Sequence, residues 1–202
     1  ADVEGLPSRT REAAAGLATK EGHKNKFVFT LSKPSMLPFL TNSPRRALRE
    51  KLYKGYLDRC NYNTNDNREI INEIVSLRTQ RAKLLGFDTH ADYMLADRMA
   101  EDPAAVYALL DELWTPALDR AKVELEDMRE LKKREGGDPD CQSWDWWYYA
   151  EKVRKEKYSI DEEMLRPYFS LPAVRRGIFE LCNKLYGLTF RPVSNIPVYN
   201  PE

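Results

Sequence analysis

The longest run of helical periodicity in the sequence lies between residues 103 and 135. Asp102 and Pro103 mark its start, because an Asp side chain caps free N–H groups and Pro is tolerated in the first turn of a helix. Apolar side chains then recur every three or four residues, at Val106, Leu110, Leu113, Ala117, Ala121, Leu125 and Met128. Pro116 lies within this run and predicts a kink. A stripe of this length predicts one long α-helix.

Further helices are predicted by capping and stop signals, at about residues 9–21, 44–62, 66–85, 89–97, 144–157 and 172–187. We therefore expect a mainly α-helical protein whose helices form a bundle-like array. One short β-strand or hairpin is predicted near the N-terminus at 26–31, because this run is β-branched and aromatic and too short for a helix. Its pairing partner is expected outside the chain or in the tail at 188–198.

The glycine-containing stretch at 136–142 is the clearest linker signal in the sequence. Residues 1–135, with the strand at 26–31, are predicted to form one helical lobe, and residues 143–202 a second one. Within the second lobe, a further capping box is predicted at 159–162. The chain begins without a methionine, and we expect both lobes to be a fragment of a larger protein.

Charge balance and cysteine content limit the function classes. Thirty-two basic and thirty-two acidic residues give no net charge, which argues against a nucleic acid held through its phosphates. No apolar run reaches the roughly 20 residues of a membrane span, so no membrane partner is expected. Cys60, Cys141 and Cys182 form no C-x-x-C pair, which is typical of reduced thiols in a cytoplasmic protein.

Histidine and cysteine side chains offer few candidates for catalysis. The two histidines are His23 and His90, with Asp92 close to the second. No His-Glu-x-x-His helix is present to hold two imidazoles and a general base on one face. None of the cysteines stands in a local motif with a basic residue, and a structural role is commoner for such thiols. We therefore assign no catalytic, cofactor-binding or metal-binding residue.

The aromatic helix predicted at 144–157 permits two interpretations. It contains three aromatic residues on one face and four basic residues after them: Trp144, Trp147, Tyr148, Lys152, Arg154, Lys155 and Lys157. Aromatic and basic groups together can grip sugars or single-stranded nucleic acid. Aromatic residues at helical spacing also form packing faces, with the charges toward solvent. We favour packing, because large aromatic side chains are mostly buried.

Several segments, in this order, resemble the family of thimet oligopeptidase and the peptidyl-dipeptidases, and within it the bacterial Dcp branch. The first matching segments are 27–35 (FVFTLSKPS), 45–53 (RRALREKLY), 66–71 (DNREII), 77–78 (LR) and 82–87 (AKLLGF). The match continues at 144–153, 165–169 and 185–190. It covers essentially the whole chain, but only the middle of the family's length.

This resemblance implies a segment of a zinc-dependent peptidyl-dipeptidase or oligopeptidase, mostly helical, that hydrolyses short peptides in a deep cleft. In that family the zinc ligands and the catalytic residues lie after the matched region. The chain itself is therefore expected to be non-catalytic, to bind no zinc and to help shape the cleft.

Any dimer of the isolated chain is expected to arise from faces that truncation exposes. The alternative function is a stand-alone, non-enzymatic helical scaffold that binds a peptide or a partner protein in a groove.

Overall fold

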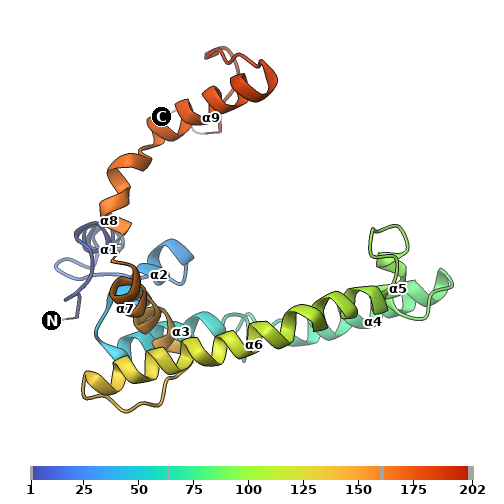
Figure 1. Ribbon diagram of the computed structural model, residues 1–202, viewed down its shortest axis with the longest axis horizontal. Helices are drawn as coiled ribbons and strands as arrows, with labels where there is room; N and C mark the ends of the chain where they lie inside the picture. The colour runs from blue at the N-terminus through green and yellow to red at the C-terminus, as the bar shows by residue number, and fades with distance from the viewer. Residues whose placement is uncertain (1, 63, 160–161, 200–202) are drawn as a thin grey trace. The chain divides into compact units, whose positions relative to one another are not determined.

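The computed structural model describes residues 2–62, 64–159 and 162–199, and it is mainly α-helical, as predicted (Figure 1). The helices are α1 (Ser8–Lys20), α2 (Lys33–Asn42), α3 (Arg46–Leu57), α4 (Arg68–Leu84), α5 (His90–Leu95), α6 (Pro103–Arg134), α7 (Trp146–Tyr158), α8 (Glu162–Leu165) and α9 (Leu171–Tyr186). Two short 3-10 helices, η1 (Ser143–Asp145) and η2 (Arg166–Phe169), precede α7 and α9. None of the described helices is both long and apolar enough to cross a bilayer.

The chain divides into two compact units, Ala1–Val153 and Arg154–Glu202. The predicted lobes at 1–135 and 143–202, joined by a linker at 136–142, stay a prediction. In the first unit, the 136–142 loop is bonded back to α6, because the N–H of Gly137 donates to the carbonyl of Lys132 at 3.0 Å. The predicted capping box at 159–162 includes residues outside the described part of the chain.

The predicted strand at 26–31 is wrong, as is its pairing with 188–198, because the described residues contain no β-strand. The backbone of this run bonds to helical neighbours instead of a second strand. The N–H of Val28 donates to the carbonyl of Ala14 at 3.1 Å, and the N–H of Thr30 donates to Ser35 Oγ at 3.0 Å. The β-branched and aromatic side chains of this run pack against neighbouring helices, because tertiary context overrides β-propensity.

Helices α1, α2 and α3 pack in succession and form the first core of this unit. Their contact surfaces carry fully or nearly fully buried apolar side chains: Ala14, Ala18, Met36, Phe39 and Leu40. The single helix predicted from residue 44 is preceded by α2, which the sequence reasoning missed. Pro34 lies in the first turn of α2, where a missing N–H is harmless. This proline therefore marks the start of a helix as well as the end of the extended run before it.

Helix α6 begins after Asp102 and continues through Pro116 to Arg134, as the apolar periodicity predicted. The Asp102 side chain accepts the N–H of Ala105 at 2.8 Å and caps the first turn. Near the other end, Met128 and Leu131 form a small second core with Tyr149 of α7. Only the C-terminal part of this long helix is thus buried in the structure.

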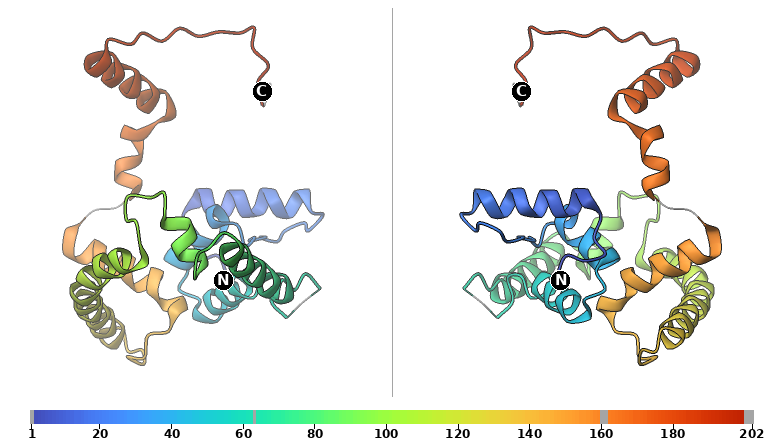
Figure 2. Two further views of the ribbon diagram at one scale, coloured as in Figure 1. Left: turned by 90° about the vertical axis from the view of Figure 1, so that its right-hand side faces the viewer. Right: turned by 90° about the vertical axis from the view of Figure 1, so that its left-hand side faces the viewer.

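Helices α4 and α6 expose much of their apolar surface. Seen nearly end-on in Figure 2, α4 (dark green) and α6 (olive) stand apart. Leu113 and Trp114 of α6 are 56% and 65% exposed, and Ile70 and Leu77 of α4 are 53% and 54% exposed. The apolar stripe of α4 therefore faces solvent within the described residues.

In the second unit, α9 ends where the sequence predicted, at Gly187. This glycine has φ 67°, a left-handed conformation that glycine adopts at little cost. Its N–H donates to the carbonyl of Asn183 at 2.8 Å. The tail then returns along the helix, because the rings of Phe190 and Phe179 stack with centroids 4.2 Å apart.

Candidate functional site

Asp145 forms the centre of a buried polar cluster in the first unit. Its carboxylate accepts hydrogen bonds from Nε and Nη2 of Arg46 at 3.0 and 2.9 Å and from Nη2 of Arg49 at 2.7 Å. Lys132 Nζ lies 3.2 Å away, and the N–H of Gln142 donates at 3.2 Å. Because Arg46 and Arg49 lie three residues apart on α3, both reach the same carboxylate. One side chain thus joins α3, η1 and the end of α6.

The electrostatics of this cluster favour a permanently ionised carboxylate. Burial by itself raises the pKa of Asp145, but the hydrogen bonds from Arg46, Arg49, Gln142 and Lys132 outweigh it and lower the pKa from 3.8 to about 2. The hydrogen bond to Asp145 also raises the pKa of Arg46. A general acid or base needs a pKa near the working pH, so this cluster is suited to holding helices together and not to proton transfer.

The predicted aromatic residues lie around this cluster and contact α3. The Trp147 ring lies 5.8 Å from the ring of Tyr53, the Arg49 guanidinium lies 4.3 Å from the ring centroid of Tyr148, and Lys54 Nζ lies 4.9 Å from that of Trp144. These contacts favour the packing interpretation of the aromatic helix over a nucleic acid surface.

The basic residues that follow the aromatic run are engaged within the chain. Lys152 forms an ion pair with Glu135. Arg154, Lys155 and Lys157 each have an interaction with another group of the protein. The four side chains therefore do not form a set of unpaired cations of the kind that binds the phosphates of a nucleic acid.

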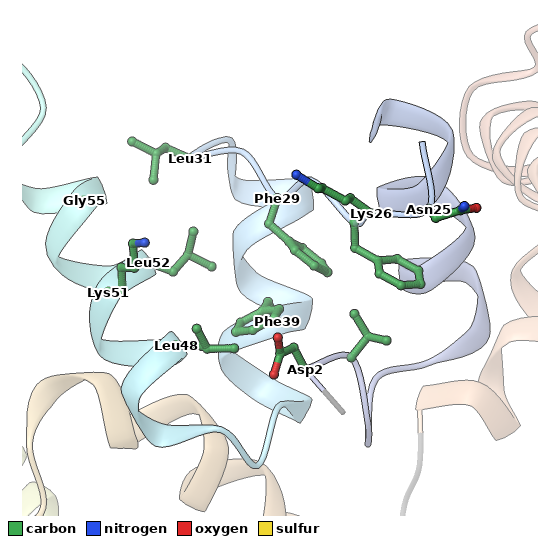
Figure 3. Close-up of a pocket in the computed structure, with 12 residues that line it drawn as sticks. Asp2, Asn25, Lys26, Phe29, Leu31, Phe39, Leu48, Lys51, Leu52 and Gly55 are labelled. Atoms are coloured by element: carbon green, nitrogen blue, oxygen red, sulfur yellow. The ribbon is translucent and has the colours of Figure 1, made fainter. Parts of the chain in front are cut away.

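An apolar pocket of about 690 Å³ opens on another side of α3. It lies between α2, α3 and the extended run that follows α1 (Figure 3). Its lining is largely aromatic and aliphatic, with three charged side chains: Phe27, Phe29, Leu31, Phe39, Leu48, Leu52, Asp2, Lys26 and Lys51. The Phe29 ring meets the Phe39 ring edge to face at 4.7 Å. A cavity of this volume and composition is typical of small-ligand and peptide sites.

The residues considered for metal binding or nucleophilic catalysis are dispersed. His23 lies exposed after α1 and His90 begins α5, while Asp92 is engaged in a capping box with Thr89. Among the described residues, no three His, Cys, Asp or Glu side chains come together as a metal site. These residues therefore do not fit a catalytic zinc ion, which needs three protein ligands.

The cysteines considered as nucleophiles form no disulfide among the described residues. Cys60, Cys141 and Cys182 are free thiols. Burial raises the pKa of the Cys141 thiol, which lowers its thiolate fraction and its nucleophilicity. The expectation that this segment carries no catalytic residue stays a prediction.

Sequence reasoning missed Asp145 and the pocket. For Asp145 a signal existed, since an acid between Trp144 and Trp146 in an aromatic run needs a partner when it is buried. Gln142 and Asp145 also form a capping box. For the pocket, the alternation of Phe27, Phe29 and Leu31 placed three apolar side chains on one face, but no local pattern showed which helices face them.

Comparison with known proteins confirms the resemblance drawn from the motifs. A family model described as peptidase family M3 matches residues 39–202. An organellar oligopeptidase A, chloroplastic/mitochondrial, of Arabidopsis thaliana is 38% identical over 210 residues, which cover 100% of this chain and 26% of that protein. The dipeptidyl carboxypeptidase of Escherichia coli K12 is 37% identical over 204 residues, covering 100% of this chain and 30% of that protein. Oligopeptidase A of the same strain is 35% identical over 207 residues, with the same coverage. The chain spans about 26 to 30% of the length of these relatives.

Proposed function

Because the chain belongs to peptidase family M3, we propose that it is a helical, non-catalytic segment of a zinc-dependent oligopeptidase or peptidyl-dipeptidase that hydrolyses short peptides. The observation that carries this proposal is the match of the whole chain to less than a third of relatives named oligopeptidase A and dipeptidyl carboxypeptidase. The resemblance implies that the catalytic groups of such an enzyme lie outside the matched part.

The exposed apolar faces of α4 and α6 support the role of a segment within a longer protein. Large apolar side chains lie on the surface along both helices: Ile70, Ile74, Leu77, Tyr107, Leu110, Leu113 and Trp114. Contiguous apolar surface of this kind is normally covered by another part of a protein. In our proposal the remaining parts of the enzyme cover these faces, and the helices help to shape the cleft that admits short peptides.

Zinc belongs, in this proposal, to the longer enzyme and not to this segment. A bound zinc ion lowers the pKa of its water toward neutrality and so supplies the nucleophile for peptide hydrolysis. The dispersal of His23, His90 and Asp92 supports placing that ion elsewhere. The proposed partners are short peptides, with neither nucleic acid nor membrane, and the proposed location is the cytoplasm.

The test is hydrolysis of internally quenched peptides by the purified 202-residue chain. With one equivalent of zinc, we expect no cleavage above buffer and no zinc retained after gel filtration. The longer gene product, prepared in parallel, is expected to cleave the same peptides and to lose activity with a chelator. Chelator-sensitive cleavage by the 202-residue chain itself, from a preparation free of other peptidases, would contradict the proposal.

The second candidate function, a stand-alone scaffold that binds a peptide or partner protein, is favoured by the pocket beside α3. An apolar groove beside an extended segment suits peptide binding without chemistry. Peptide binding by the 202-residue chain, together with a gene product that has no further domain, would select this alternative.

A further inference from the structure

The side chains of Phe27, Phe29 and Leu31 all line the pocket beside α3. Alternate residues of an extended chain point to one side, so this part of the run is extended although it forms no strand. Figure 3 shows Phe29 directed toward Phe39 in the middle of the pocket, with Leu31, Leu48 and Leu52 on one side and Lys26 on the other. One face of the extended run thus forms a wall of the pocket.

The backbone of this run is bonded on one edge only. The N–H groups of Val28 and Thr30 donate to Ala14 and Ser35. By contrast, the N–H groups of Phe27, Phe29 and Leu31 have no acceptor among the described residues. Because N–H groups alternate between the two edges of an extended chain, these three groups form a free edge. Free edges of this kind pair with the main chain of another extended peptide.

The charges of the lining favour a ligand with a negative group. Lys26 and Lys51 are exposed, and neither forms an ion pair within the described residues. Asp2 is the acidic residue among those that line the pocket, so cations outnumber anions there. A free C-terminal carboxylate is the negative group that a short peptide always carries.

From these three observations we infer that the pocket beside α3 binds a short extended peptide through its apolar side chains and its C-terminal carboxylate. The peptide main chain pairs with the free edge at 27–31, alternate apolar side chains enter between Phe29, Phe39 and Leu52, and the carboxylate meets Lys51. This site takes part in no bond cleavage. It rests on the second candidate function, peptide binding at this pocket, and on the geometry of the lining, and it does not depend on the proposed peptidase function.

The first arm of the test uses the 202-residue chain and a fluorescein-labelled hexapeptide of alternating leucine and threonine with a free carboxylate, followed by fluorescence anisotropy. Methylating the peptide nitrogens that face the free edge removes about two hydrogen bonds, and we expect roughly tenfold weaker binding. Methylating the peptide nitrogens that point away from the free edge leaves binding unchanged. Replacing the carboxylate by an amide weakens binding about two- to fivefold, as for an exposed ion pair.

The second arm uses a variant that fills the pocket without harming the helix. Gly55 of α3 also lines the pocket. A Cβ at this position lies 3.5 Å from Leu31 Cδ2, which is ordinary contact, and Leu is a better helix former than Gly. We expect Gly55→Leu to weaken binding more than tenfold and to stay folded by circular dichroism. Gly16→Leu on α1, where a Cβ has no neighbour within 4 Å, is the matched control and binds as the original chain does.

A charge variant completes the test. Lys51→Gln is expected to abolish the difference between the acid and the amide peptide, whereas Lys83→Gln on α4 leaves it unchanged. The inference is overturned if no peptide saturates the chain at about 1 mM, well above the affinities of specific peptide sites. It is also overturned if both methylated peptides bind equally, if the acid and the amide peptide bind the original chain equally, or if Gly55→Leu binds like Gly16→Leu. Because no step measures hydrolysis, these outcomes are separate from the test of the peptidase proposal. The second candidate function is separated from this site by the gene product, since it also requires that no further domain is encoded.

Discussion

Replacing Asp145 by Asn is the perturbation that tests the buried polar cluster most directly. The Asn side chain keeps the shape of Asp but has no charge, so it leaves Arg49 and Lys132 buried without a counter-charge. Their side chains are 2% and 5% exposed. Removing one partner of a buried ion pair costs about 3 to 5 kcal/mol. We therefore expect Asp145→Asn to lower the free energy of unfolding of the first unit by about this amount.

The pH dependence of the free energy of unfolding gives a second estimate of how much this cluster stabilises the fold. The pKa of Asp145 is lowered from 3.8 to about 2, which corresponds to ~2.5 kcal/mol of stabilisation of the folded state. Because the folded pKa is the lower one, this contribution is complete above about pH 5 and is lost as the pH falls toward 2. Asp145→Asn removes this part of the pH dependence.

The assay is urea unfolding followed by tryptophan fluorescence. The four tryptophans are residues 114, 144, 146 and 147, and all of them lie in the first unit, so the signal reports that unit alone. Asp119→Asn on α6 is the control, since Asp119 and its partner Lys122 are both well exposed and the pair adds little. The reasoning is refuted if Asp145→Asn unfolds at the same urea concentration as Asp119→Asn. It is also refuted if Asp145→Asn loses as much stability between about pH 5 and 2 as Asp119→Asn does.

Three further predictions concern the helix ends and the exposed faces. Gly187→Ala places a side chain at a left-handed position and is expected to destabilise α9 by about 1 kcal/mol, whereas Gly177→Ala within α9 stabilises it by a similar amount; hydrogen exchange of the α9 amides measures both, and equal rates would contradict the assignment. Asp102→Ala removes the cap of α6 and lowers stability by about 1 kcal/mol, while Asp102→Asn does not; urea unfolding distinguishes them. Leu113→Ser combined with Trp114→Ser is expected to reduce association of the isolated chain in sedimentation velocity, because it interrupts the apolar stripe of α6.

The elements with local signals at both ends were predictable from the sequence. Helix α6 has a capping Asp, a Pro in its first turn and a glycine pair after its end, and α9 has Gly187. Each of these signals acts within a few residues. The apolar stripes were also recognised correctly as helical, but periodicity alone does not say whether a stripe is covered, and those of α4 and α6 are exposed in this chain.

The features that sequence reasoning missed depend on contacts between distant residues. Asp145 is buried by Arg46 and Arg49, which lie almost 100 residues earlier, and no local pattern indicates that pairing. The run at 26–31 has the composition of a strand, but Ala14 and Ser35 take its hydrogen bonds. Its side chains line the pocket together with Phe39 of α2 and residues of α3. The pocket can therefore be recognised only once the run, α2 and α3 are placed in space.

The central claim is that this chain is a non-catalytic part of an M3 peptidase, and the most direct measurement is the sequence of the source gene on both sides of the codons for this chain. Our account predicts one reading frame that continues past Glu202 and encodes a His-Glu-x-x-His helix, with a later Glu as the third zinc ligand. A stop codon directly after Glu202, or a continuing frame without that motif, would contradict the claim and leave the peptide-binding scaffold as the function to pursue.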